Sequence, residues 1–141
     1  MCNKKDIEKL ITMAIENQKN SYAPYSKFNV SAALLTSSGN IYTGVNVENS
    51  SYPAGCCAET NAINTAINCG EKQIEMIAIV GGLNYTIKDY CAPCGVCRQV
   101  MREFANPNKM HVILAKTPTD YKCFTLEDLL SMSFGPEDLA K

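Results

Sequence analysis

Apolar residues recur at helical spacing near the start of the chain. They lie three or four residues apart, at Ile7, Leu10, Ile11, Ala14 and Ile15. This periodicity, with charged and polar residues between, is typical of an amphipathic surface helix. We therefore predict a helix over residues 5–19. The following segment, residues 22–26, contains Pro24 and ends the pattern.

Two runs with strand-like composition come next, at residues 28–36 and 41–47. Both are rich in β-branched and apolar residues. The four residues between them, Ser37-Ser38-Gly39-Asn40, favour a turn. The pattern predicts an antiparallel hairpin that follows the first helix.

Helical and strand-like patterns alternate in the rest of the chain, after the predicted hairpin. We predict a helix over 58–69 with Gly70 after its end, a buried strand over 74–80, a helix near 95–105 stopped by Pro107, and a strand over 110–116. Residues 121–130 are assigned one short strand and one short helix. A helix between successive strands indicates a parallel part of the sheet, and the front hairpin makes the sheet mixed. No linker or repeat divides the chain, so we expect one α/β domain over residues 1–141.

Composition and charge restrict the class of ligand that we expect. The chain has 141 residues, of which 46% are hydrophobic and 19% are charged, as in an ordinary globular protein. The net charge is −1 and the thirteen basic residues are scattered. Because nucleic-acid binding needs a continuous basic surface, we expect a small neutral ligand and no polynucleotide. No secretory signal is recognised, and no apolar run approaches the ~18–20 residues of a membrane span, so we expect a cytoplasmic protein without a membrane partner.

The clustered cysteines are the clearest indication of chemical function in the sequence. The eight cysteines are Cys2, Cys56, Cys57, Cys69, Cys91, Cys94, Cys97 and Cys123. In a reducing compartment, clustered thiols indicate metal binding or catalysis. Cys57 begins one predicted helix, and Cys94 with Cys97 begins the next. Residues i and i+3 share a helix face, and helix starts gather at the carboxyl ends of parallel strands, so the three sulfurs can meet at one ion.

Three thiolates leave a tetrahedral zinc ion with an open position, which is typical of a catalytic site where water is activated. Glu59 is placed to transfer protons there. Cys-x-x-Cys alone is more often a structural zinc half-site or a redox pair, and a fourth thiol from Cys56 or Cys91 would close the site. We expect both to be bystanders. His111, in an apolar strand, is expected to be a structural residue with satisfied hydrogen bonds.

The order Cys-x-Glu and then Pro-Cys-x-x-Cys matches the known signature of zinc deaminases. The chain resembles the homotetrameric cytidine deaminases in four segments: Tyr22-Ala-Pro-Tyr-Ser-Lys-Phe28, Thr43-Gly-Val-Asn-Val-Glu-Asn49, Cys57-Ala-Glu59 and Pro93-Cys-Gly-Val-Cys-Arg-Gln-Val100. The resemblance implies a three-layer α/β/α sandwich with a five-stranded mixed sheet. It also implies one Zn²⁺ per subunit and hydrolysis of cytidine and 2′-deoxycytidine to the uracil nucleosides and ammonia, a reaction of pyrimidine salvage.

The same resemblance implies roles for individual residues. Cys57, Cys94 and Cys97 correspond to zinc ligands, Glu59 to the proton shuttle, Asn46 and Glu48 to the ribose-binding pair, Phe28 to the residue stacked on the pyrimidine, Ala58 to a backbone partner of the ring, and Tyr52 and Phe134 to residues that approach a neighbouring subunit's site. Taken by themselves, Phe28 suits the core and Asn46 suits a strand-end turn better than they suit these binding roles, so both alternatives stay open.

One position departs from the resemblance. Many relatives carry, after the catalytic glutamate, an arginine that bonds the zinc thiolates, whereas this chain has Thr60. We expect Arg98 to offset the charge of the thiolates, although an ion pair on the helix surface is an equal alternative. Three other functions remain: a blasticidin-type deaminase, a deaminase of bases in nucleic acid, and a zinc module without catalysis.

Overall fold

A mixed sheet runs through the described part of the chain, residues 3–140 of the computed structural model. Its strands are β1 (Phe28–Thr36), β2 (Ile41–Val45), β3 (Ile74–Leu83), β4 (His111–Thr117) and β5 (Asp120–Thr125). The five strands lie in the order β2-β1-β3-β4-β5. β3 and β4 are parallel, and the other neighbouring pairs are antiparallel. The predicted α/β fold with a mixed five-stranded sheet is confirmed.

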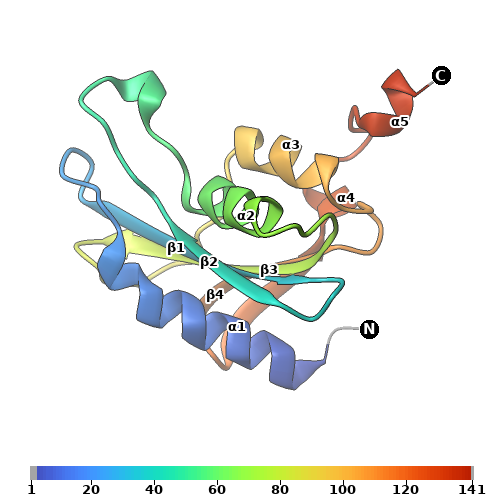
Figure 1. The fold of residues 1–141 in the computed structure, drawn as a ribbon. Coiled ribbons are helices and arrows are strands. Elements are labelled where there is room, and N and C mark those ends of the chain that lie inside the picture. Colours follow the sequence, from blue (N-terminus) through green and yellow to red (C-terminus); the bar gives the residue numbers. More distant parts are fainter. Residues whose placement is uncertain (1–2, 141) are drawn as a thin grey trace.

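Helices lie on both faces of this sheet. The described helices are α1 (Lys4–Asn17), α2 (Ala58–Asn68), α3 (Gly95–Glu103), α4 (Leu126–Leu129) and α5 (Pro136–Leu139), and single 3₁₀ turns lie at Gln18–Asn20 and Tyr52–Ala54. α5 stands away from the sheet (Figure 1). Figure 1 shows α1 on one face of the sheet and α2 with α3 on the other, which gives three layers. Within residues 3–140, no helix combines the length and the hydropathy that a membrane crossing requires.

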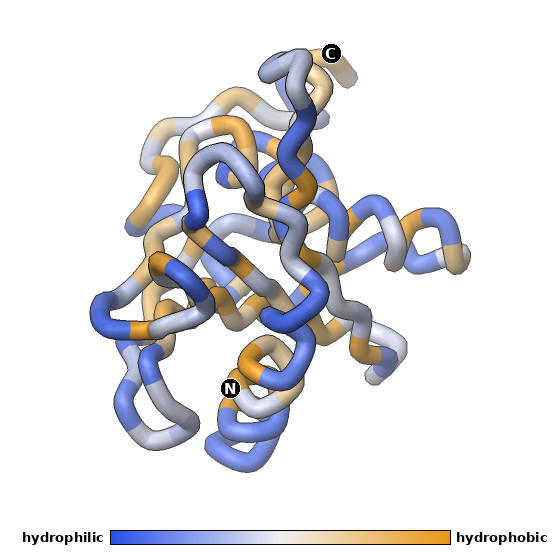
Figure 2. The backbone as a smooth tube through the Cα atoms, turned by 90° about the vertical axis from the view of Figure 1, so that its left-hand side faces the viewer, coloured by the Kyte–Doolittle hydropathy of each residue, from blue (hydrophilic) through white to orange (hydrophobic). Residues whose placement is uncertain are grey.

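The core is divided by the sheet into two halves. Ala32 and Leu34 of β1 pack toward α2 and α3, whereas Ala33 packs toward α1, because successive side chains of a strand point to opposite faces. The apolar stripe expected on the first helix is buried at Ile7, Leu10, Ile11 and Ala14. Figure 2 shows hydrophobic and hydrophilic residues alternating around the turns of this helix.

One predicted boundary shifts for an identifiable reason. β2 ends at Val45, two residues before the expected end. The Asn46 N–H still donates to the Val30 carbonyl of β1 at 3.2 Å, but Val47 pairs with Tyr22 and Cys56 in place of β1. The Asn46 side chain also bonds to β1: its Oδ1 accepts the N–H of Val30 at 2.9 Å, and its Nδ2 donates to the carbonyl of Phe28 at 2.8 Å. His111 lies in β4, within the predicted strand, but the expectation that its hydrogen bonds are satisfied was wrong. Its Nδ1 is buried without a hydrogen-bond partner in the described structure.

The topology brings two helix starts to one end of the sheet. β2 and β3 are both antiparallel to β1 and therefore run in the same direction. β2 leads into α2 and β3 into α3, each through a long connection; Figure 1 shows the β2–α2 connection reaching out from the sheet. Gly44 allows α2 to pack directly on β2, since a Cβ there would lie 2.3 Å from the backbone nitrogen of Ala62.

Candidate metal centre and substrate pocket

Three thiols meet at the starts of α2 and α3. The sulfurs of Cys57, Cys94 and Cys97 all lie within 4.8 Å of one another, and the Cys57 and Cys94 sulfurs are 3.8 Å apart. Cys57 and Cys94 are the N-caps of their helices, and Cys97 lies in the first turn of α3. A tetrahedral zinc ion with Zn–S bonds of about 2.3 Å holds its sulfurs about 3.8 Å apart. The number, type and spacing of these donors fit zinc with one position left open.

The thiols respond unequally to their surroundings. Burial raises the pKa of Cys57 to about 11. Burial also raises the pKa of Cys97, and the negative charge of Glu59 adds to the rise. Burial acts in the same direction on Cys94, but hydrogen bonds from the Cys97 backbone, the Cys97 and Cys57 thiols and the Val96 backbone bring its pKa below the ordinary value. Because zinc binds thiolates, loading the site must release protons from those thiols that are protonated, and the raised pKa values of Cys57 and Cys97 oppose this release.

Glu59 lies beside the cysteines and away from solvent. The residue is 4% exposed, and its Oε2 is 3.7 Å from the sulfur of Cys97, which donates to it. Burial raises the pKa of this carboxyl group. None of the ion pairs found among residues 3–140 involves Glu59. A buried carboxyl group with a raised pKa, next to a metal site, has the properties of a proton-transfer group.

Thr60 and Arg98 occupy different positions around the cluster. The hydroxyl of Thr60 lies 3.4 Å from the sulfur of Cys97. The guanidinium of Arg98 donates to the carbonyls of Pro93 at 2.8 Å and Leu129 at 2.7 Å. Arg98 therefore braces the turn that carries Cys94 and ties it to α4, whereas Thr60 touches a thiol directly. Compensation of thiolate charge by Arg98 stays a prediction.

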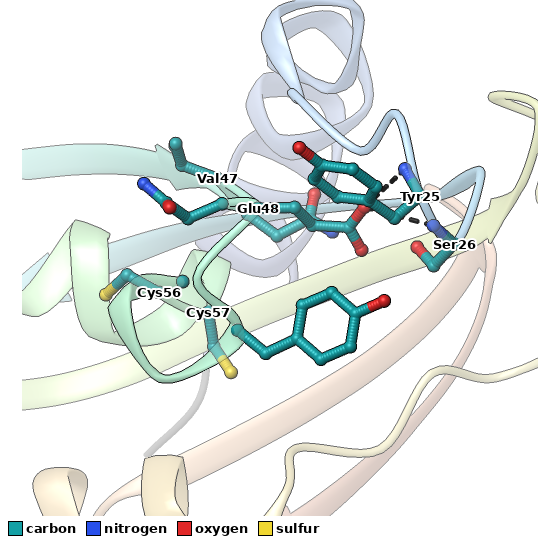
Figure 3. Close-up of a pocket in the computed structure, with 10 residues that line it drawn as sticks. Tyr25, Ser26, Val47, Glu48, Cys56 and Cys57 are labelled. Atoms are coloured by element: carbon teal, nitrogen blue, oxygen red, sulfur yellow. Dashed lines mark hydrogen bonds between the residues drawn. The ribbon is translucent and has the colours of Figure 1, made fainter.

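The remaining cysteines lie outside the cluster. In Figure 3 the sulfurs of Cys56 and Cys57 point in different directions, as expected for neighbours. Cys91 packs against the core, and burial raises its thiol pKa to about 11. The three-cysteine group found among the described residues contains neither Cys56 nor Cys91. Cys69 and Cys123 are exposed, and Cys2 lies outside the described residues.

A cavity of about 570 Å³ opens beside Cys57. Its lining residues are Tyr25, Ser26, Asn46, Val47, Glu48, Asn49, Tyr52, Gly55, Cys56 and Cys57. This volume lies within the range of small-molecule sites. The cavity places Asn46 and Glu48, expected at the ribose, together with one of the metal-binding thiols.

Glu48 is held by the backbone of a segment distant in sequence. Its Oε1 accepts the N–H groups of Tyr25 at 3.0 Å and Ser26 at 3.1 Å (Figure 3). The Ser26 side chain and these N–H groups lower the pKa of Glu48. The carboxylate is therefore charged at neutral pH, and its second oxygen can accept a hydrogen bond from a ligand. Sequence reasoning missed Tyr25 and Ser26, because a backbone N–H carries no sequence signal.

Phe28 lines a second cavity of about 360 Å³ with Gly81 and Cys91, and its side chain is 38% exposed. The interpretation of Phe28 as plain core is thus not what the structure shows. A Cβ at Gly81 would lie 2.9 Å from the Cys91 sulfur and 3.2 Å from the Phe28 ring, so glycine permits their close approach. Ala58, the first residue of α2, is fully buried.

Two aromatic residues are left on the surface. Tyr52 is 77% exposed and Phe134 is 59% exposed. The backbone carbonyl of Phe134 accepts a hydrogen bond from Gln99 Nε2 at 3.0 Å. The buried Arg102, which the sequence analysis did not single out, donates to the Ser133 hydroxyl at 2.8 Å and pairs with Glu137. α3 therefore holds the C-terminal segment that carries Phe134.

Comparisons with known proteins agree with this site. The family model of the cytidine and deoxycytidylate deaminase zinc-binding region matches residues 4–114. A cytidine deaminase of Sporosarcina psychrophila is 40% identical over 135 residues, which is 96% of either chain. A probable cytidine deaminase of Dictyostelium discoideum is 40% identical over 97% of this chain and 89% of its own.

Solved structures lead to the same family. The crystal structure of cytidine deaminase from Burkholderia pseudomallei has a TM-score of 0.80 at 39% identity, covering 89% of this chain and 97% of its own. That of cytidine deaminase from Mycobacterium tuberculosis has a TM-score of 0.76 at 33% identity, covering 92% and 98%. The chain belongs to the cytidine and deoxycytidylate deaminase zinc-binding family.

Proposed function

We propose that the protein is a zinc-dependent cytidine deaminase that hydrolyses cytidine and 2′-deoxycytidine to uridine and 2′-deoxyuridine. The reaction joins the oxygen of water to C4 of the cytosine ring, breaks the bond from C4 to the exocyclic amine and releases ammonia. The observation that carries the proposal is the cluster of three thiols within 4.8 Å of one another beside the buried Glu59. The relatives named cytidine deaminase support the choice of substrate.

The three cysteines hold the metal, and Glu59 moves protons. A zinc ion bound by three thiolates supplies a Lewis acid that lowers the pKa of a water molecule and makes it nucleophilic at neutral pH. The raised pKa of Glu59 suits its carboxyl group to transfer two protons from that water. The first would go to ring N3, where the product keeps it, and the second, from the oxygen by then bonded to C4, would go to the leaving amine. The burial of Glu59 excludes bulk water, which would otherwise compete for these protons.

Asn46 and Glu48 are suited to hold a sugar hydroxyl between them. The Oδ1 of Asn46 accepts two hydrogen bonds from the protein, and one Nδ2 hydrogen is used on Phe28. A primary amide has two such hydrogens, so the free one can donate to a ligand oxygen. The second carboxylate oxygen of Glu48, which the N–H groups of Tyr25 and Ser26 do not use, can accept a hydrogen bond from the ligand. A hydroxyl group satisfies both, because it accepts from one side and donates to the other.

The base end of the substrate is assigned to Phe28 and Ala58. Phe28 presents a half-exposed ring at a cavity, which suits stacking on a pyrimidine. Ala58 stands at the start of α2, where backbone N–H groups lack partners inside the helix and can bond a ring substituent. In this arrangement Phe28 would cover one face of the ring, and the sugar would point to Glu48.

We propose a homotetramer in which Tyr52 and Phe134 complete the sites of neighbouring subunits. Both rings are exposed and apolar, and Tyr52 lines the cavity beside Cys57. Aromatic residues exposed at a cavity rim are typical of protein interfaces. A cytoplasmic location and a role in pyrimidine salvage belong to the same proposal. The clustered thiols of Cys57, Cys94 and Cys97 can bind a metal ion only when they are reduced, which suits a reducing compartment.

One absorbance assay tests the function. Zinc-loaded protein is mixed with cytidine, 2′-deoxycytidine, cytosine, adenosine, blasticidin or a cytosine-containing oligonucleotide, and the ultraviolet spectrum and the ammonia are followed. We expect turnover of the two cytosine nucleosides only. Exclusive turnover of blasticidin or of the oligonucleotide would replace the proposal by that rival. Saturated zinc with no turnover of any substrate would indicate a structural zinc module.

A further inference from the structure

A buried polar network lies behind Asn46, outside the cavity described above. Gln18 begins the 3₁₀ turn that follows α1, Ser21 comes directly after this turn, and Asn29 is near the start of β1. All three are buried, with exposures of 4%, 6% and 3%. Gln18 Nε2 donates to the Asn29 carbonyl at 3.0 Å. Neither Ser21 nor Asn29 lines the cavity beside Cys57. Their side chains nevertheless connect to the sugar end through Asn46.

The direction of every hydrogen bond in this network follows from its backbone partners. Asn29 Oδ1 faces the N–H of Tyr85 at 3.1 Å, so that atom is the acceptor and Asn29 Nδ2 must be the donor to Ser21 Oγ at 3.1 Å. Asn46 Oδ1 faces the N–H of Val30, so it too is an acceptor. The Ser21 hydroxyl hydrogen, lying between them, must therefore donate to Asn46 Oδ1.

The network has consequences for the free donor of Asn46. Two donors on Oδ1 hold the amide in one orientation and draw electron density toward oxygen, which makes the N–H groups stronger donors because hydrogen bonds in a chain polarise one another. The Tyr85 hydroxyl also donates to the Ser21 carbonyl at 3.3 Å, which restrains the loop that carries Ser21. The orientation of Asn46 is thus set by residues up to 64 positions apart in sequence.

We propose that Ser21 and Asn29 are positioning residues that aim and strengthen the Asn46 N–H toward a sugar hydroxyl of the nucleoside. The inference rests on the proposed function and deepens it, since it concerns recognition of the sugar and leaves the chemistry at the ring unchanged. Neither residue touches the substrate. Their effect is confined to substrates that carry the hydroxyl bound by Asn46 and Glu48.

The test compares cytidine with 2′,3′-dideoxycytidine, which lacks both ring hydroxyls of the ribose. For Ser21→Ala we expect kcat/KM on cytidine to fall about three- to tenfold, mainly through KM, as is typical when one neutral hydrogen bond is lost. On the dideoxynucleoside kcat/KM should change little. The ratio of kcat/KM on cytidine to kcat/KM on the dideoxynucleoside should therefore fall about three- to tenfold in Ser21→Ala.

Ser31→Ala provides a matched control. Ser31 is on β1, is fully buried and has a hydroxyl with no partner in the described structure. Ser31→Ala removes the same atom from a buried position but breaks no hydrogen bond to Asn46, so the ratio of kcat/KM on the two substrates should stay at the wild-type value. Ser21→Thr, which keeps the hydroxyl, should restore the ratio. A fall of equal size on both substrates in Ser21→Ala would overturn the inference.

Two further variants keep the test decisive. If Ser21→Ala does not fold, as judged by its melting temperature, Asn29→Ala should shrink the ratio in the same direction, and an unchanged ratio there would reject the inference. Asn46→Ala reports on the proposed function: if the ratio is unchanged in Asn46→Ala, the sugar site itself is misassigned. A wild-type protein without turnover of cytidine would refute the function, which is a separate result.

Discussion

The metal cluster and the sugar-binding side of the cavity are built in opposite ways. The cluster uses three cysteines at or within one turn of two helix starts, so local helix geometry aims each sulfur. On the sugar side, Glu48 is held by the backbone of residues 25 and 26, and Asn46 by β1 and the loop that carries Ser21. In the first region each sulfur is oriented by its own helix start, and the fold brings the two helix starts together. In the second region, segments distant in sequence orient the side chains themselves.

This contrast predicts different responses to mutation. Damage to the cluster should remove metal and activity together, because the metal ties the two helix starts to each other. Damage to the sugar side should weaken substrate binding and leave the metal in place. The following changes test this distinction.

The largest effect is expected from Cys94→Ala. Loss of one of three thiolates should reduce zinc from one ion per chain to less than ~0.1, with activity falling in proportion and thermal stability decreasing. Zinc content by mass spectrometry, together with the melting temperature, measures this. Cys91→Ser is the control, and it should retain its zinc. Full occupancy in Cys94→Ala would show that the ligand set is wrong.

Glu59→Gln separates metal binding from proton transfer. The amide has nearly the same shape as the carboxyl group but cannot shuttle a proton, so kcat should fall about 10²- to 10⁴-fold while zinc stays bound. Steady-state kinetics on zinc-quantified protein provides the measurement. Turnover within a factor of about three of wild type would exclude Glu59 from the mechanism.

Glu48→Gln is expected to act on binding alone. Replacing the carboxylate removes a charge-assisted acceptor for the sugar hydroxyl, so KM for cytidine should rise about tenfold with zinc unchanged. Activity on 2′,3′-dideoxycytidine is the internal control and should hardly change. A large loss of zinc in this variant would contradict the independence of the two regions.

The smallest effect is expected from changes at Arg98. They distinguish compensation of the thiolate charge from support of the turn that carries Cys94. Arg98→Gln should weaken zinc affinity by about tenfold, as is usual for groups that support a ligand. Arg98→Lys keeps the charge but loses the forked contact with two carbonyls. Recovery of affinity in Arg98→Lys, in a competition titration with a chelator, would favour charge compensation; failure to recover would favour bracing of the Cys94 turn.

Much of the fold was predictable from local patterns. The stripe from Ile7 to Ala14 gave the first helix, and the turn residues 37–40 gave the hairpin, because both signals arise within a few neighbouring positions. The end of β2 was not predictable. It depends on Val47 pairing with Tyr22 and Cys56, which both lie outside the hairpin, in place of β1.

The sequence by itself determined the reactive groups and the element on which each one lies. The spacing of Cys94 and Cys97 and the adjacency of Cys57 and Glu59 follow from helix periodicity, which is a local property. The tertiary structure alone decided that Glu59 is buried, that Glu48 is held by backbone N–H groups, and that Ser21 and Asn29 stand behind Asn46. Burial and directed hydrogen bonds depend on which distant segments are brought into contact, and a pattern within a single segment does not contain that information.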